Sequence, residues 1–198
     1  MASWSARRLG AEPLGETGLV RAFFGLPLPE PHRAVLDGYI AECASLAPDF
    51  RWTPAANLHL TVRFLGQVEL RVAVGIAERV AATRPRSFEV RLGDVGVFKR
   101  GRLARVVWLG VVGGETEMAE LAAVVEIECV REGLEPERRR FSAHLTLARA
   151  RPRDGARPPS LAAPPDLPAW RPSELVLYRS HLGRGGSVYE PLQTVRLG

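Results

Sequence analysis

Residues 58–65 read Leu-His-Leu-Thr-Val-Arg-Phe-Leu, an alternation that predicts a β-strand. Side chains two residues apart share one face of a strand, so His59 and Thr61 point to one side and the leucine between them to the other. The pattern recurs at residues 144–147 as His-Leu-Thr-Leu. The chain holds only four histidines, and two of them occupy this repeated position. The repeat predicts two strands, each with an imidazole and a hydroxyl over an apolar back.

These residue types suit displacement at a phosphorus centre if the two strands meet. The pKa of histidine lies near neutrality, so one of His59 and His144 can take a proton from water while the other donates one to a departing oxygen. The hydroxyls of Thr61 and Thr146 can donate to phosphate oxygens without adding a competing charge. The repeat therefore favours a metal-independent phosphoesterase site.

Two other interpretations of the repeat stand beside this one. A single histidine on a strand is commonly a packed or hydrogen-bonded structural residue, and only the duplication argues otherwise. A zinc site needs three or four ligands, and neither motif has a His-x-His, His-xxx-His or Cys-xx-Cys neighbour. We therefore expect neither a metal nor another cofactor.

The rest of the chain predicts an α+β fold with mostly antiparallel sheets, because strand and helix patterns are mixed with hairpins. The expected strands are 20–28, 58–65, 87–98, 104–112, 144–150, 174–182 and 187–196, and the expected helices are 31–47, 69–83 and 115–132. Gly133 is a candidate helix cap, and the proline-rich residues 152–172 predict a long surface loop. Residues 1–18 are expected to form a flexible tail before a single domain at 19–198.

Composition narrows the setting in which the protein works. Hydrophobic residues make up 46% and charged residues 25%, as in ordinary globular proteins. The first residues carry arginines but no apolar core behind them, so we expect no secretory signal, and the apolar runs of the sequence are too short to span a bilayer. Cys43 and Cys129 lie on helical stripes, which indicates buried thiols in a reducing compartment. A cytoplasmic protein is expected, and a monomer because no coiled-coil repeat appears.

Positive charge is concentrated toward the C-terminus. Residues 135–198 carry 11 of the 27 basic side chains and only 6 of the 22 acidic ones, so the net excess lies there. The planar guanidinium group of arginine binds phosphate well, so this asymmetry of charge favours an anionic ligand. The same asymmetry is compatible with an alternative function, a protein that binds RNA ends without catalysing their hydrolysis.

Longer stretches around the motifs carry a family resemblance. They are RAFFGLPLP (21–29), NLHLTVRFLGQV (57–68), RVVWLGV (105–111), FSAHLTLAR (141–149) and LYRSHLGRGGSVYEPL (177–192). With them, residues 20–198 resemble the RNA 2′,3′-cyclic phosphodiesterases, also described as 2′–5′ RNA ligases, of the two-histidine phosphoesterase superfamily. The resemblance implies two lobes related by a pseudo-twofold axis, with one motif strand from each lobe at a cleft. It implies hydrolysis of RNA 2′,3′-cyclic phosphate ends, or of cyclic nucleotides, to 2′-phosphates without metal.

Carried onto the matching positions, the resemblance implies that His59 and His144 are catalytic and that both threonines hold phosphate oxygens. His59 is expected to be the acid for the 3′ oxygen and His144 to activate water.

The resemblance also suggests Arg149 as a phosphate or ribose contact, although strand alternation places Arg149 off the His144 face unless the strand bends. Phe24 and Tyr178 are candidate contacts for a base or ribose, and His32 is expected at the surface. A 2′–5′ oligonucleotide or a cyclic phosphate on ADP-ribose is an alternative substrate.

Overall fold

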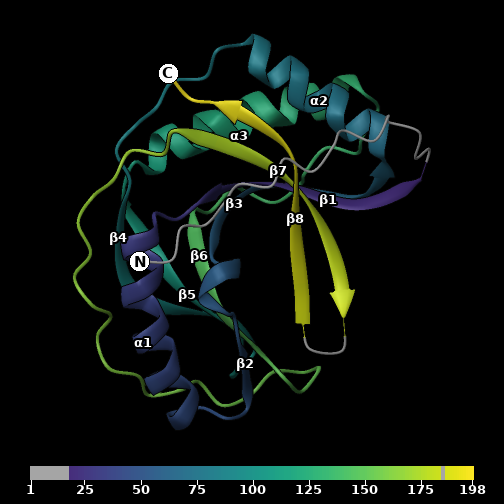
Figure 1. Ribbon diagram of the computed structural model, residues 1–198. Helices are drawn as coiled ribbons and strands as arrows, with labels where there is room; N and C mark the ends of the chain where they lie inside the picture. The colour runs from purple at the N-terminus through teal and green to yellow at the C-terminus, as the bar shows by residue number, and fades with distance from the viewer. Residues whose placement is uncertain (1–17, 184–185) are drawn as a thin grey trace, which may run out of the picture.

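The computed structural model describes residues 18–183 and 186–198, which form one eight-stranded sheet with three α-helices (Figure 1). The strands are β1 (Leu19–Pro27), β2 (Phe50–Trp52), β3 (His59–Glu69), β4 (Arg91–Arg100), β5 (Leu103–Gly113), β6 (His144–Ala150), β7 (Glu174–Gly183) and β8 (Gly186–Arg196). The helices are α1 (Glu30–Leu46), α2 (Leu70–Ala82), α3 (Glu115–Arg131) and the 3₁₀ turn η1 (Ala55–Asn57). The α+β class is confirmed, whereas the expected tail, apart from Gly18, lies outside the described residues.

The sheet consists of two halves that meet at a narrow seam. Its strand order is β4-β5-β6-β3-β1-β7-β8, and β2 also pairs with β6. Every pairing between these strands in the described chain is antiparallel. The halves β4-β5-β6-β2 and β3-β1-β7-β8 are joined by one register pair, Leu60 opposite Leu145. Both leucines are fully buried, so the seam is anchored in the core.

The helices cover the sheet unequally. In Figure 1, α2 and α3 lie together over the half formed by β3, β1, β7 and β8, while α1 lies beside β2 in the other half. The predicted apolar stripes of α1 and α3 are confirmed, since their members are buried: Leu36, Tyr39, Ile40 and Cys43 in α1, and Met118, Leu121, Ala122, Val125 and Cys129 in α3. Gly133 ends α3 in the left-handed region, with φ of 82°, as expected of a cap.

Three features differ from the sequence expectations. Strand β2 was not predicted, because three residues are too few for a periodic pattern. The proline-rich loop carries no helix or long strand, but it is fastened to the sheet by bridges at Ala156 and Trp170. The expectation that His32 lies at the surface is wrong: it is 4% exposed and contacts that loop, with its Nε2 2.8 Å from the carbonyl oxygen of Pro168 and its ring 4.9 Å from that of Trp170.

Among the described residues, no helix is both long and apolar enough to cross a membrane.

Candidate active site

The seam between β3 and β6 brings the two motifs together. Leu60 pairs with Leu145 in antiparallel register, so the register places His59 beside Thr146 and Thr61 beside His144. All four side chains lie on the face opposite the buried leucines, here called the histidine face. The two histidines are diagonal neighbours, which in a regular sheet lie about 7–8 Å apart. Each imidazole is thus flanked by a hydroxyl from the other strand.

A β-bulge follows each motif at the equivalent position. The β1–β3 register skips Val62 and the β5–β6 register skips Leu147, so each strand carries one extra residue directly after its threonine. Such an extra residue reverses the alternation beyond it. Leu147 and Ala148 are accordingly both fully buried, and the exposed Arg149 lies on the histidine face. The sequence placed Arg149 on the face of His144 only if the strand bends, and this bulge supplies that bend.

The two bulges also distinguish the halves of the site. The residue equivalent to Arg149 on β3 is Phe64, which is 48% exposed and whose ring lies 5.6 Å from that of Phe23. Arg149 has no hydrogen bond or ion pair within the described part of the chain. The pseudosymmetric frame therefore places a free cation on one side and an exposed aromatic ring on the other. A ligand with an anionic and a flat apolar part would bind in a single direction.

The same hydrogen bond orients both imidazoles. His59 Nδ1–H donates to the carbonyl oxygen of Asn57 at 2.8 Å, and His144 Nδ1–H donates to that of Ser142, also at 2.8 Å. In each case the acceptor precedes the histidine by two residues. The hydrogen bond fixes the proton of the neutral ring on Nδ1 and leaves Nε2 able to accept or deliver one. The two rings are prepared in the same way for proton transfer.

Aromatic rings pack around both histidines. The ring of His59 lies 4.6 Å from Phe23, 6.2 Å from Tyr178 and 5.1 Å from Tyr189, the last at an interplanar angle of 90°. The ring of His144 lies 4.9 Å from Phe98, at 89°. The two edge-to-face contacts, Tyr189 with His59 and Phe98 with His144, are a favourable arrangement that restricts the position of each imidazole. His59 is thus enclosed on more sides than His144.

Gly25 on β1 makes room for the ring of His59. A β-carbon added to Gly25 would lie 3.1 Å from His59 Cδ2 and 3.3 Å from the carbonyl oxygen of Leu60. The imidazole therefore lies directly on the β1 backbone. A glycine inside a predicted strand signals such a close approach, and this signal could have identified Gly25 from the sequence.

Burial and charge lower the pKa of both imidazoles. Burial lowers the pKa of His59 to about 4, aided by the positive charges of Arg149 and His144 and opposed by the Asn57 carbonyl. Burial also lowers the pKa of His144 below 6.5, again aided by Arg149 and opposed by the Ser142 carbonyl. Both rings are neutral at pH 7 when no ligand is bound. A phosphate between them would raise both pKa values, since an opposite charge favours the protonated form.

Comparison with known proteins assigns the family. A relative from Aeropyrum pernix named RNA 2′,3′-cyclic phosphodiesterase is 36% identical over 147 residues, which are 71% of this chain and 82% of the relative. The chain belongs to the LigT-like phosphoesterases. The family model described as LigT like Phosphoesterase matches residues 26–108. A relative of the same name from Methanothermobacter thermautotrophicus is 31% identical across 90% of this chain and 99% of its own.

The solved structures agree with this assignment. Escherichia coli LigT complexed with 3′-AMP matches this phosphoesterase with a TM-score of 0.77 and 29% identity, over 91% of this chain and 99% of that one. The family resemblance and the enzyme class inferred from the two motifs are thereby confirmed.

One predicted contact of this LigT-like phosphoesterase is wrong. Phe24, a candidate for stacking on a base, is fully buried in the hydrophobic core. It shares its strand face with the buried Ala22 and Leu26. Its neighbour Phe23 points to the histidine face instead, where it is 2% exposed beneath other rings. Tyr178 does lie there, with its ring 5.2 Å from that of Phe23.

Several residues at the site were missed from the sequence. Phe98 and Tyr189 flank the histidines from β4 and β8, strands that no local pattern places beside the motifs. Asn57 Nδ2 donates to the carbonyl oxygen of Ser187 on β8 at 2.7 Å. Because the carbonyl of Asn57 also accepts from His59, this residue links the β7–β8 hairpin to the orientation of the imidazole.

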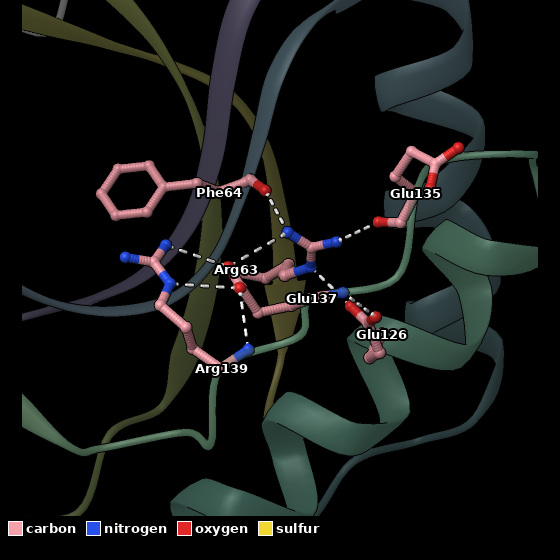
Figure 2. Close-up of polar contacts among 6 residues, drawn as sticks. All are labelled: Arg63, Phe64, Glu126, Glu135, Glu137 and Arg139. Atoms are coloured by element: carbon pink, nitrogen blue, oxygen red, sulfur yellow. Dashed lines mark hydrogen bonds and ion pairs between the residues drawn. The ribbon is translucent and has the colours of Figure 1, made fainter.

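An arginine directly after the first motif holds the chain segment that leads to the second. Figure 2 shows the guanidinium group of Arg63, a residue of β3, beside Glu126 of α3 and beside Glu135 and Glu137 of the following segment. Its Nε donates to Glu126 Oε2 of α3 at 2.5 Å, and its Nη2 donates to the carbonyl oxygen of Glu135 at 2.8 Å. The backbone N–H of Glu137 donates to the other oxygen of Glu126 at 2.7 Å. A pocket of about 610 Å³ lies beside this network, between β3 and residues 133–137.

Proposed function

We propose that this chain hydrolyses 2′,3′-cyclic phosphate ends of RNA to 2′-phosphates, with His59 and His144 as a general acid/base pair and without a metal. The observation that carries the proposal is the matched pair of imidazoles, each tied through Nδ1 and each beside a threonine of the other motif. The relatives named RNA 2′,3′-cyclic phosphodiesterase support the substrate. The hydroxyls of Thr61 and Thr146 have no hydrogen bond to described residues, so they are available to phosphate oxygens.

The proposed reaction is one in-line displacement. A water oxygen attacks phosphorus while one imidazole Nε2 accepts a proton from that water. The bond from phosphorus to O3′ breaks, and the second imidazole delivers its Nε2 proton to O3′. Thr61, Thr146 and Arg149 stabilise the charge on the non-bridging oxygens. The product is a 2′-phosphate with a free 3′-hydroxyl, and both rings regain their starting states by exchanging protons with solvent.

The surroundings of the two rings favour His59 as the base and His144 as the acid, the reverse of the direction expected from the resemblance. His59 is enclosed by Phe23, Tyr178 and Tyr189, so the charged form of its ring is the costlier one. Within residues 18–183 and 186–198, His144 has one aromatic neighbour, and it retains a proton more readily than His59. The ring that enters the reaction protonated is therefore His144.

In the deciding experiment the protein is incubated with 2′,3′-cyclic AMP in the presence of EDTA, and the products 2′-AMP and 3′-AMP are separated and quantified. We expect 2′-AMP to accumulate at an undiminished rate in chelator. Either 3′-AMP as the product or a requirement for added divalent metal would contradict the proposal. Absence of turnover with retained binding would favour the RNA-end-binding alternative.

Single replacements test the assigned roles. His59→Ala and His144→Ala should each lower kcat by about 10²–10⁴-fold, the contribution of one positioned acid or base. His181→Ala is the matched control, since this exposed histidine pairs with Glu190 at 2.8 Å and has no ring contact with the two motif histidines. Wild-type rates in either motif variant would refute its role.

We propose further that residues 19–198 act as one domain and as a monomer in the cytoplasm. One sheet and one hydrophobic cluster spanning both halves support the single domain. Two free, buried cysteines are compatible with a reducing compartment. Light scattering of the purified protein would test the monomer.

A further inference from the structure

Two arginines lie directly opposite each other beside the histidine face. Arg51 on β2 pairs in register with Arg149 on β6. Opposed residues of an antiparallel pair project from the same face with their β-carbons about 4.5–5.5 Å apart, and like charges at such positions are destabilising. Both side chains are exposed, and neither has a hydrogen bond or ion pair within residues 18–183 and 186–198.

Some other arginines of the described chain have carboxylate partners, although several exposed ones have none. Arg33 pairs with Glu30 at 2.5 Å, and Arg100 approaches Asp154 at 3.9 Å. Residues 51 and 149 instead place two uncompensated cations side by side, at a cost to the fold. An arrangement of this kind favours an anion that bridges both guanidinium groups.

The position of the arginine pair indicates which anion this is. Arg149 lies on the histidine face beyond the bulge of β6, and its charge lowers the pKa of both His59 and His144, so Arg149 adjoins the position proposed for the reacting phosphate. Arg51 lies one strand further out, on the far side of Arg149 from β5. A second phosphate held there would belong to the same ligand as the reacting one.

We propose that Arg51, together with Arg149, binds a second phosphate of the substrate, the phosphodiester that joins the terminal nucleotide to the rest of an RNA strand. This inference rests on the proposed function and assigns a residue that favours RNA strands over cyclic mononucleotides. A cyclic mononucleotide has one phosphate and leaves Arg51 unused. A strand of two or more nucleotides supplies the second anion and relieves the repulsion between the arginines.

The test compares 2′,3′-cyclic AMP with a trinucleotide that ends in a 2′,3′-cyclic phosphate, for the wild type, Arg51→Gln and Arg51→Lys. In Arg51→Gln, we expect the ratio of kcat/KM for the trinucleotide to that for the mononucleotide to fall about tenfold, the size of one lost charge-assisted contact. Arg51→Lys should lose less, because it keeps the charge. An unchanged ratio in Arg51→Gln would overturn the proposal.

Two further measurements distinguish a specific effect of Arg51 from the general effect of removing one positive charge. Arg86→Gln removes an exposed arginine between α2 and β4 and should leave the ratio unchanged. The melting temperature of Arg51→Gln should equal or exceed that of the wild type, since a repulsive pair is removed. A lower melting temperature would contradict the predicted repulsion.

Binding distinguishes failure of this inference from failure of the proposed function. If the wild type turns over neither substrate, the proposed function fails, and the affinity for a trinucleotide 2′-phosphate still tests Arg51. In that assay Arg51→Gln should weaken binding and lower the slope of log affinity against log salt by about 0.7. Equal affinity and slope in wild type and variant would refute the second phosphate site.

Discussion

Arg149 influences both motif histidines through its charge. It lies on their face only because the bulge at Leu147 reverses the alternation of β6. Burial, aided by the charge of its guanidinium, lowers the pKa of His59 and of His144, so the free protein holds both rings neutral at pH 7. Bound phosphate would offset this charge, which links substrate binding to protonation of the acid.

The pH profile of kcat/KM for 2′,3′-cyclic AMP tests this electrostatic arrangement. We expect a bell-shaped profile, because the base must be neutral and the acid protonated. The rate should rise with pH through about 4, where His59 loses its proton, and fall through the pKa of His144, below 6.5. In Arg149→Gln, both limbs should move to higher pH, since a cation that lowers both pKa values has been removed.

The conservative variant separates charge from contact. Arg149→Lys keeps the positive charge but loses the bidentate fork, so its rate should fall while both limbs stay in place. If the limbs of Arg149→Gln also stay in place, the charge of Arg149 does not set the titration of the histidines.

Close contacts between secondary-structure elements determine where the reacting groups lie. Strand β1 passes beneath His59 at Gly25, and the β7–β8 hairpin is tied to the same histidine through Asn57 and Ser187. Both contacts join segments far apart in the chain. Errors of about 1 Å in such contacts are costly in catalysis.

Replacing Gly25 with alanine should displace the imidazole of His59. The new β-carbon would lie within 3.1 Å of the ring and 3.3 Å of a backbone oxygen, so the ring must shift. We expect kcat to fall at least about tenfold for 2′,3′-cyclic AMP. Gly38→Ala is the control, because that helical glycine has nothing within 4 Å of an added β-carbon. The control should keep full activity and gain up to about 1 kcal/mol in stability.

The Arg63 network fastens the segment between α3 and β6. The Arg63 side chain is 12% exposed, and its removal leaves the partly buried Glu126 carboxylate without its guanidinium partner. Arg63→Ala should lower the free energy of unfolding by about 2–3 kcal/mol in urea titrations. Arg71→Ala removes an exposed ion pair with Glu69 and should leave the midpoint unchanged. Equal midpoints for the two variants would show that the Arg63 network contributes no stability.

At the scale of the whole molecule, the buried imidazole of His59 links stability to pH. Its pKa is about 4 in the folded protein and about 6.5 in an unfolded chain. As pH falls from 6.5 to 4, the unfolded chain takes up a proton that the folded protein excludes. The contribution of this group to stability is therefore complete above pH 6.5 and is lost toward pH 4.

His59→Gln should lose less stability on acidification than the wild type. Between pH 7 and pH 4.5, the wild type should lose about 2–3 kcal/mol more than the variant, since other titrating groups are common to both proteins. Urea unfolding at the two pH values measures the difference. Equal losses would mean that His59 titrates normally in the folded protein.

The features predicted correctly from the sequence are those that depend on local pattern. Alternation places His59 and Thr61 on one face of a strand, helical period identifies the buried stripes of α1 and α3, and Gly133 marks a helix end. Repetition of the motif in a histidine-poor chain, with the longer stretches around it, led to the family. Each of these signals lies within a few residues of the chain and follows from backbone geometry alone.

The tertiary structure decided the features that depend on pairing between distant strands. The skipped residue Leu147 directs Arg149 to the histidine face, and the skipped residue Val62 does the same for Phe64. Partner strands place Phe98 and Tyr189 against the imidazoles. The register of the three-residue strand β2 sets Arg51 opposite Arg149. A bulge or a register is a relation between two segments, so neither segment's sequence specifies it alone.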